Sequence, residues 1–322
     1  MIEKDVISIE IGGYMEFPKF SGNMLHQDAI LLNCARNCLA YLIEAKGIKK
    51  ILLPKFLCAS VSQICKNYNL KIRYYSITSD FCPIEINVEE EEWFYLVNYY
   101  GQINNDMIKK IKKKHNRIIV DNVQAYFQMP IKGVDTIYSC RKYFGVPDGA
   151  LLYTDTQISR GLEQDKSVER MKHLFGRYEK SASEYYLDYL KNENTIDGLT
   201  LRYMSKITRN LLCGIDYENV KLIRERNYLF LSQAFSSINR LTLEMPVGPF
   251  MYPLYLSEGN LTRKKMQKKG IYISTLWTDV FDICSECDLE YKMAQNIMPL
   301  PCDQRYELED VKQMVDIIMK II

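Results

Sequence analysis

The sequence contains no long apolar run, and this absence limits the classes of protein that it encodes. No stretch approaches the roughly 18 apolar residues that a membrane span requires. The opening MIEKDVISIE carries charges where a signal peptide needs an apolar segment. We therefore expect a cytoplasmic protein with no membrane partner. A composition of 47% hydrophobic and 25% charged residues over 322 positions is ordinary for a globular chain.

Histidine is scarce, and neither sign of charge dominates. Only three histidines and one C-x-x-C motif, at 284–287, are present, so we expect no metal site. The ten cysteines are expected to be reduced, because the chain lacks a secretion signal. A net charge of +2 gives no overall attraction to nucleic acid. The basic run at 109–117 predicts the solvated face of a helix, and we expect no nucleic-acid partner.

Helical and strand-like segments alternate between residues 30 and 155. Such alternation predicts an α/β fold with a mostly parallel sheet that is covered on both faces. Apolar spacing predicts helices at 37–48, 60–70 and 105–115. Short apolar runs predict strands at 50–54, 71–77, 93–101, 117–122, 135–140 and 150–155.

The second half of the chain is richer in helical patterns. Residues 160–195 are charged, aromatic and helical in period, and a second helical stretch covers 205–237. Strand character returns at 246–256, and the chain ends in a helix preceded by Asp303 or a neighbour. Since 322 residues exceed the usual size of one compact core, we expect two domains. The large domain would span 1–214, with an N-terminal arm and interface helices at 160–205, and a small C-terminal α+β domain would span 215–322.

Two titratable residues follow predicted strands at the carboxyl edge of the sheet, where open α/β folds bind ligands. Asp121 ends the strand IIVD, and it is either a local hydrogen-bond acceptor or the partner of a buried cation. Lys142 lies in YSCRKYFGVPDGALLYT. It is either a lysine that reaches into solvent or, in a dry pocket with a lowered pKa, an amine able to form a Schiff base.

The order of several segments along the chain carries a resemblance to a known family. These segments are ARNCL, LLPKFLCASV, YLVNYYGQIN, IIVDNVQAYF, YSCRKYFGVPDGALLYTD, GLTLRYMSKI and LPCDQRYELEDV. They resemble, in this order, the motifs of the DegT/DnrJ/EryC1/StrS-type sugar aminotransferases, which are pyridoxal-phosphate enzymes of fold type I. The resemblance implies a large domain with a mostly parallel central sheet and a small C-terminal α+β domain.

The resemblance also assigns roles to residues around the expected cofactor. It implies that Lys142 forms the internal aldimine with pyridoxal 5'-phosphate and then transfers protons. Asp121 would keep the pyridine nitrogen protonated, so that the ring acts as an electron sink. Gln124 would touch the 3-hydroxyl oxygen, and Ser139 would bind the phosphate.

The phosphate would also meet the start of the first helix, at Ala35, Arg36 and Asn37, through backbone N–H groups and the helix dipole. Arg36 replaces the threonine that is usual in the family, and it either binds the phosphate or points to solvent. Thr200 stands where the family has an asparagine that reaches the neighbouring subunit's phosphate.

Three departures from the family pattern affect the site. Cys58 stands where an aromatic residue often stacks on the cofactor, so Phe56, Tyr99 or Tyr100 would supply the stack, if one exists. Thr200 replaces the asparagine, with one extra residue inserted nearby, and the spacing from Ser139 to the lysine is short. Tyr100 is also a candidate for contact with the substrate or the partner's phosphate.

The leading hypothesis is a pyridoxal-phosphate-dependent aminotransferase that acts on a keto sugar, nucleotide-linked, with a glutamate-like amine donor. The resemblance implies a homodimer whose sites are completed across the interface. One alternative is a lyase or dehydratase on the same fold, although related dehydratases replace the lysine with histidine. Another is a catalytically silent relative that binds a sugar nucleotide.

Overall fold

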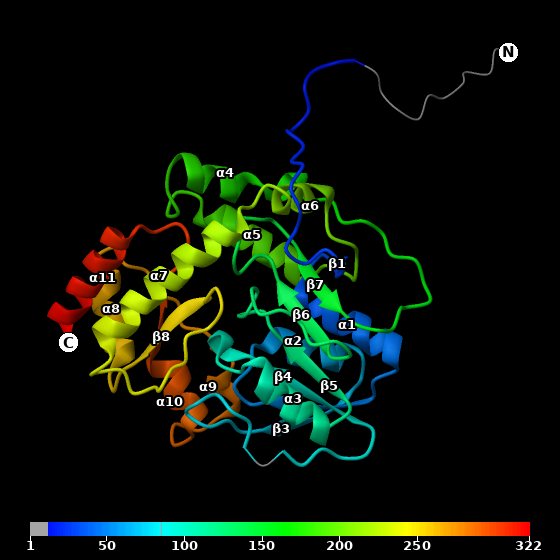
Figure 1. Cartoon of the computed structure of the whole chain (residues 1–322), viewed down its shortest axis with the longest axis horizontal. Coiled ribbons are helices and arrows are strands. Elements are labelled where there is room, and N and C mark those ends of the chain that lie inside the picture. Colours follow the sequence, from blue (N-terminus) through cyan, green and yellow to red (C-terminus); the bar gives the residue numbers. More distant parts are fainter. Residues whose placement is uncertain (1–11, 85) are drawn as a thin grey trace.

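A seven-stranded sheet forms the centre of the molecule in the computed structural model, which describes residues 12–84 and 86–322 (Figure 1). The strand order is β1-β7-β6-β5-β4-β2-β3. The strands are β1 (Ile30–Leu32), β2 (Lys50–Pro54), β3 (Lys71–Tyr75), β4 (Glu92–Val97), β5 (Ile118–Asp121), β6 (Asp135–Ser139) and β7 (Ala150–Tyr153).

Five consecutive strands of this sheet, from β6 to β3, run parallel, and β7 is antiparallel to both of its neighbours. The expected α/β fold with a mostly parallel sheet is therefore confirmed. Every residue of β5 and β6 is buried, as expected for central strands that are covered on both faces. Strand β1 was not predicted, because three residues are too few to show a period.

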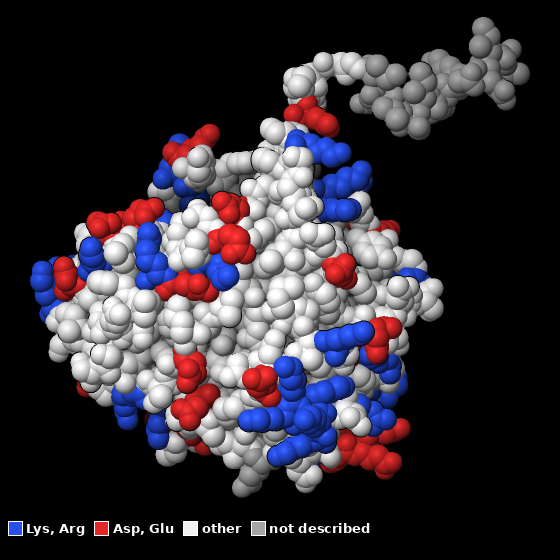
Figure 2. Space-filling view, viewed as in Figure 1, with Lys and Arg blue, Asp and Glu red and all other residues white. Residues whose placement is uncertain are grey.

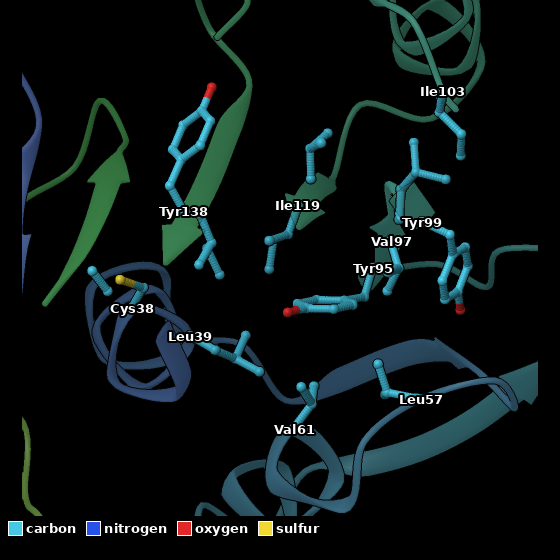
Figure 3. Packing of buried hydrophobic residues seen from close by; sticks show 14 of the residues in the cluster. Cys38, Leu39, Leu57, Val61, Tyr95, Val97, Tyr99, Ile103, Ile119 and Tyr138 are labelled. Atoms are coloured by element: carbon cyan, nitrogen blue, oxygen red, sulfur yellow. The ribbon is translucent and has the colours of Figure 1, made fainter. Parts of the chain in front are cut away.

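Helices α1 (Ala35–Lys46) and α2 (Ala59–Asn67) pack against one face of the sheet. Figure 3 shows Leu39 of α1 and Val61 of α2 pointing toward Tyr95 of β4. Gly47, with a φ of 61°, adopts the left-handed conformation that ends α1. The first helix thus ends where the sequence predicted a stop.

Helix α3 (Asn105–Lys114) carries the densest basic run of the chain. The Asn104 side chain accepts a hydrogen bond from the Met107 N–H and caps this helix. Ile108 is buried, whereas Lys109, Lys110 and Lys113 are exposed. Figure 2 shows the resulting group of basic side chains on the surface, over the position of α3 in Figure 1. The prediction of a solvated helix face is confirmed.

The segment from 160 to 212 contains shorter helices than the sequence predicted. They are η2 (Val168–Arg170), α4 (Lys172–Glu179), α5 (Tyr186–Asp197) and α6 (Lys206–Leu212). The expectation of helix from residue 160 onward is wrong, because residues 163–165 pair with the backbone of Tyr203. The Asp165 carboxylate then accepts from Arg170 Nη2 at 2.7 Å, which holds this loop against η2.

The C-terminal third surrounds a small antiparallel sheet, β8 (Met251–Tyr255) with β9 (Ile297–Pro301). Its helices are α7 (Tyr217–Phe235), α8 (Gly259–Gln267), α9 (Val280–Ile283), α10 (Leu289–Asn296) and α11 (Leu308–Ile321). A second hydrophobic cluster, which includes Leu231, Tyr252 and Ile318, lies between this sheet and its helices. The domain boundary after residue 214 stays a prediction.

The last helix begins later than predicted. Glu307 and Asp310 form a reciprocal capping box at the start of α11, so Glu307 is the cap. Asp303 instead binds the Arg305 guanidinium at 2.6 and 2.8 Å. Within residues 12–84 and 86–322, no helix combines the length and the apolar character needed to cross a bilayer.

Candidate active site

The predicted site residues gather at the carboxyl edge of the parallel strands. Parallel strands direct the loops that follow them to one edge of a sheet. Lys142 follows β6, Asp121 ends β5, Tyr100 follows β4, and Cys58 follows β2. The topology therefore brings residues that lie more than 80 positions apart in the sequence to one side of the molecule.

Asp121 is held in a defined orientation at the end of β5. Its Oδ2 accepts from the Tyr95 hydroxyl at 2.8 Å, and its Oδ1 accepts from the Val123 N–H at 3.0 Å. The residue is buried, and burial raises the pKa of the carboxyl, while the charge of Lys142 opposes this rise. An ionised carboxylate has about four acceptor positions, so Asp121 retains acceptor capacity for another donor.

Lys142 lies near enough to Asp121 for the two charges to interact. Burial lowers the pKa of the Lys142 amine, and the negative charge of Asp121 partly offsets this effect. Cys58 also raises the pKa of the amine, whereas the positive charge of Arg141 lowers it. The side chain as a whole is exposed. The protein around the amine thus favours its neutral form, although the residue as a whole is exposed.

The turn that carries Lys142 is anchored by buried polar groups. Asp148 accepts from the Ser205 N–H at 2.8 Å and from the Ser205 and Thr208 hydroxyls. Gly149 adopts a φ of 115° at the end of the turn, a backbone conformation that favours glycine. The sequence Pro147-Asp148-Gly149 therefore fixes the path of the chain directly after the lysine.

Gln124 and Tyr100 contact each other beside the site. Gln124 is buried, and its Oε1 accepts from the Tyr100 N–H at 2.8 Å. Tyr100 has a φ of 52°, and its buried hydroxyl has no hydrogen-bond partner within the described part of the chain. The Gln124 amide nitrogen stays available, whereas its oxygen holds the Tyr100 backbone.

The start of α1 lies beside the lysine turn, because the Asn33 carbonyl accepts from the Gly149 N–H at 2.6 Å. Asn37 is occupied inside the protein. Its N–H donates to the Cys34 carbonyl at 3.0 Å, and its side chain donates to the Thr200 carbonyl at 2.9 Å. Cys34 supplies no side-chain cap. The N–H groups of the first helical residues, Ala35 and Arg36, have no partner within an α-helix.

Two arginines beside this helix start bind carboxylates of α5. Arg36 Nη2 lies 2.5 Å from Asp197 Oδ1, and Arg141 forms an ion pair with Glu193. Glu193 and Asp197 are four residues apart and so share one helix face. The sequence allowed two alternatives for Arg36, binding to the phosphate or exposure to solvent. In the structure its guanidinium binds a third group, a carboxylate 161 positions away in the sequence.

Ser139 and Thr200 occupy different surroundings. Ser139 is buried at the end of β6, directly before the lysine turn. Thr200 is exposed, and its carbonyl accepts from the Asn33 and Asn37 side chains at 3.0 and 2.9 Å. The Thr200 backbone is therefore tied to the start of α1.

An aromatic cluster packs around Phe56, in the loop that follows β2 and carries Cys58. Trp277 packs its ring against Phe56 at 4.4 Å and against Tyr99 and Tyr100 at 5.5 and 5.7 Å. The Tyr99 hydroxyl also donates to the Phe56 carbonyl. Phe56, Tyr99 and Tyr100 are buried. Together with Trp277 they form an aromatic wall beside the loop after β2. Trp277 brings the C-terminal third of the chain to this wall.

One residue that contacts the lysine turn was not predicted. Arg224 of α7 is 1% exposed and donates to the Tyr143 carbonyl at 3.2 Å. A signal for it exists in the sequence, because Arg224 lies seven residues after Tyr217 and four before Tyr228. This spacing places it on the apolar face of a helix.

Comparisons with known proteins connect this geometry to solved structures. No protein-family model and no curated protein sequence matches the chain. The structure, however, is similar to NtdA from Bacillus subtilis with bound cofactor PMP, at a TM-score of 0.65 and 11% identity, over 91% of this chain and 73% of that one.

Two further solved structures show the same similarity. Sugar aminotransferase CalS13 from Micromonospora echinospora matches at a TM-score of 0.62 and 12% identity, over 91% of this chain and 87% of that one. A DegT DnrJ EryC1 StrS aminotransferase from Brucella abortus matches at 0.59 and 15%, over 91% and 85%. The resemblance stated from the sequence is thus confirmed at the level of the fold, which is the fold of these aminotransferases.

Proposed function

We propose that the chain is a pyridoxal-phosphate-dependent aminotransferase that acts on a keto sugar, nucleotide-linked, with a glutamate-like amino acid as amine donor. One observation carries this proposal. The acid and the amine required by such an enzyme, Asp121 and Lys142, follow adjacent parallel strands and interact electrostatically at the edge where α/β folds bind ligands.

The residues present fit the cofactor. Pyridoxal phosphate, when bound, supplies an aldehyde and an electron-withdrawing ring that accepts negative charge from the substrate. Asp121 retains acceptor capacity beyond its bonds with Tyr95 and Val123, so it is suited to hold a proton on a ring nitrogen. The buried position strengthens that interaction, because the local dielectric constant is low.

Lys142 is suited to bond the aldehyde and to move protons. A lowered pKa increases the fraction of neutral amine near neutral pH, and only the neutral amine is nucleophilic. With the cofactor bound, the same Nζ would also serve as the base that moves protons at the substrate. Lys142 also argues for transamination over the dehydratases of the same fold, in which histidine replaces the lysine.

The phosphate group is assigned to the start of α1. We infer that the N–H groups of Ala35 and Arg36 and the Ser139 hydroxyl bind it, with the positive end of the helix dipole. The N–H of Asn37 does not join them, because it already bonds Cys34. Thr200 is exposed and would meet the partner subunit's cofactor in a dimer.

The sugar substrate is assigned to the aromatic wall that holds Tyr100 and Trp277. Aromatic rings with a polar atom suit sugars and nucleobases, because one side is apolar and the tip forms hydrogen bonds. The similarity of the fold to a sugar aminotransferase supports this substrate class.

We also infer a homodimer. Helices α4 and α5 and the arm at 12–20 carry exposed apolar side chains, of which Tyr178 is 91% and Leu187 is 78% exposed. Apolar residues on adjacent exposed elements are typical of a subunit interface. The cytoplasmic location stays a prediction.

A second candidate function is supported by the carboxylates of α5. Asp197 and Glu193 already neutralise Arg36 and Arg141, which is compatible with a silent relative that binds a sugar nucleotide without cofactor chemistry.

An amine-transfer assay separates the two candidates. Purified protein would be incubated with pyridoxal phosphate, ¹⁵N-labelled glutamate and a panel of nucleotide-linked keto sugars. We expect labelled amino sugar and an equal amount of 2-oxoglutarate, and no product with Lys142→Ala. Binding of the sugar nucleotide without any transfer, by protein that ignores pyridoxal phosphate, supports the silent relative and contradicts the enzyme.

A further inference from the structure

Arg224 is a buried cation that the site described above does not use. It lies on the inner face of α7 and is 1% exposed. No carboxylate in residues 12–84 or 86–322 forms an ion pair with it. The nearby Asp303 already binds Arg305 at 2.6 Å. Burial of a charge without a paired carboxylate is costly unless hydrogen bonds compensate for the lost water.

The guanidinium is instead satisfied by backbone carbonyls and one amide. Arg224 Nη1 donates to the Pro249 and Phe250 carbonyls at 2.9 and 3.2 Å, and Nη2 donates to the Tyr143 carbonyl at 3.2 Å. Its Nε donates to Gln304 Oε1 at 2.8 Å. The guanidinium also lies over the Tyr143 ring, 4.5 Å from the centroid. Only the planar fork of arginine serves acceptors in so many directions at once.

These contacts hold two segments that neighbour Lys142. Tyr143 is the next residue in the chain, and its carbonyl also accepts from Gln304 Nε2 at 2.8 Å. The ring of Phe250 lies 5.5 Å from the Lys142 amine. Arg224 therefore fixes the backbone that follows the lysine and the loop whose aromatic ring borders the amine.

We propose that Arg224 is a positioning residue that controls the orientation and reactivity of the Lys142 amine from the C-terminal third of the chain. The inference rests on the proposed function only in taking Lys142 as the reacting group. Without Arg224, the Tyr143 carbonyl and the Phe250 loop lose a shared donor, and the lysine turn relaxes toward water. The neutral amine then loses the environment that favours it, so that the amine reacts at higher pH.

The test measures the amine itself in cofactor-free full-length protein. Formaldehyde with cyanoborohydride would methylate the lysines, and mass spectrometry of the Lys142 peptide would give its rate at each pH. With Arg224→Lys, which keeps the charge and loses the fork, we expect the rate at neutral pH to fall roughly tenfold, as for one unit of pKa. The pH profile of the methylation rate should shift to higher pH. The matched control is Arg226→Lys on the same helix, which should leave both unchanged.

A second variant covers the case in which Arg224→Lys fails to fold. Gln304→Leu removes the amide that bonds both Arg224 and Tyr143, and we expect a smaller shift of the pH profile in the same direction. Circular dichroism and thermal unfolding would establish that each variant is folded. An unchanged pH profile of Lys142 in either folded variant overturns the proposal. Failure of the wild-type protein to react with pyridoxal phosphate would contradict the proposed function and leave this result intact.

Discussion

The carboxylate of Asp121 raises the pKa of the Lys142 amine, whereas burial of that amine lowers it. The relation is mutual, because the lysine charge opposes the rise that burial causes in the pKa of Asp121. Two residues whose ionisation states depend on each other, at adjacent strand ends, are typical of functional sites. The predictions below follow from this pair and from the contacts that hold it.

Replacement of Asp121 by asparagine should reduce activity and increase stability. Loss of one preorganised electrostatic contact to a reacting group commonly costs roughly 100-fold or more in rate. The folded-state pKa of Asp121 is raised, so the ionised carboxylate destabilises the fold above that pKa. We expect Asp121→Asn to melt a few degrees higher than the wild type near neutral pH, since roughly 1 kcal/mol corresponds to about 2 °C at this size. Melting curves at several pH values would measure this.

The pH dependence supplies the control for this prediction. As pH falls through the folded pKa, the wild-type carboxyl takes up its proton, and the difference between wild type and Asp121→Asn should shrink. A melting temperature lower than that of the wild type at neutral pH would contradict the account of Asp121.

Loss of the Tyr95 hydroxyl should affect Asp121 selectively. This hydroxyl donates to Asp121 Oδ2 at 2.8 Å, and its bond lowers the pKa of the carboxyl. Tyr95→Phe should therefore raise that pKa further and destabilise the fold by roughly 1–3 kcal/mol, the usual cost of a lost bond to a charged group. Urea denaturation at several pH values would measure the stability. Tyr75→Phe, which removes the hydroxyl that donates to the Tyr95 carbonyl, serves as a matched control. Equal pH dependence in the two variants would argue against a specific role of Tyr95.

The turn after the lysine should not tolerate a side chain at Gly149. A Cβ there would approach Thr208 Cγ2 at 2.9 Å, and the φ of 115° is strained for any other residue. We expect Gly149→Ala to lower the free energy of unfolding by roughly 1–3 kcal/mol, measured by urea denaturation. Gly47→Ala, at a φ of 61° with no atom within 4 Å of the added Cβ, should be milder. Equal stability of the wild type and Gly149→Ala would contradict the described turn.

The positions of several candidate site residues were predictable because strand ends are visible in the sequence. The apolar runs before Asp121 and before Ser139 are short and bounded by polar residues, which marks them as buried strands. A parallel sheet then brings their ends to one edge without further information. Lys142 follows from the same logic, since its turn separates two such strands.

The electrostatic partners were not predictable in this way. Arg36 and Asp197 are 161 positions apart, and no local pattern connects them. Arg224 has a helical spacing that marks the buried face, but the charged residues around it resemble a solvated helix surface. The local period at 160–167 predicts a helix, and no helix forms there because a tertiary bridge to Tyr203 overrides this period.

Borohydride reduction of the protein with pyridoxal phosphate tests the central claim most directly. Lys142 is one of many lysines in the chain, and the account predicts that this amine alone is modified when the cofactor is stoichiometric. Peptide mapping by mass spectrometry should locate the reduced pyridoxyl group on Lys142, with loss of the absorbance band near the visible edge, and Lys142→Ala should show neither. A pyridoxyl group spread over surface lysines, or the same modification in Lys142→Ala, would contradict the account.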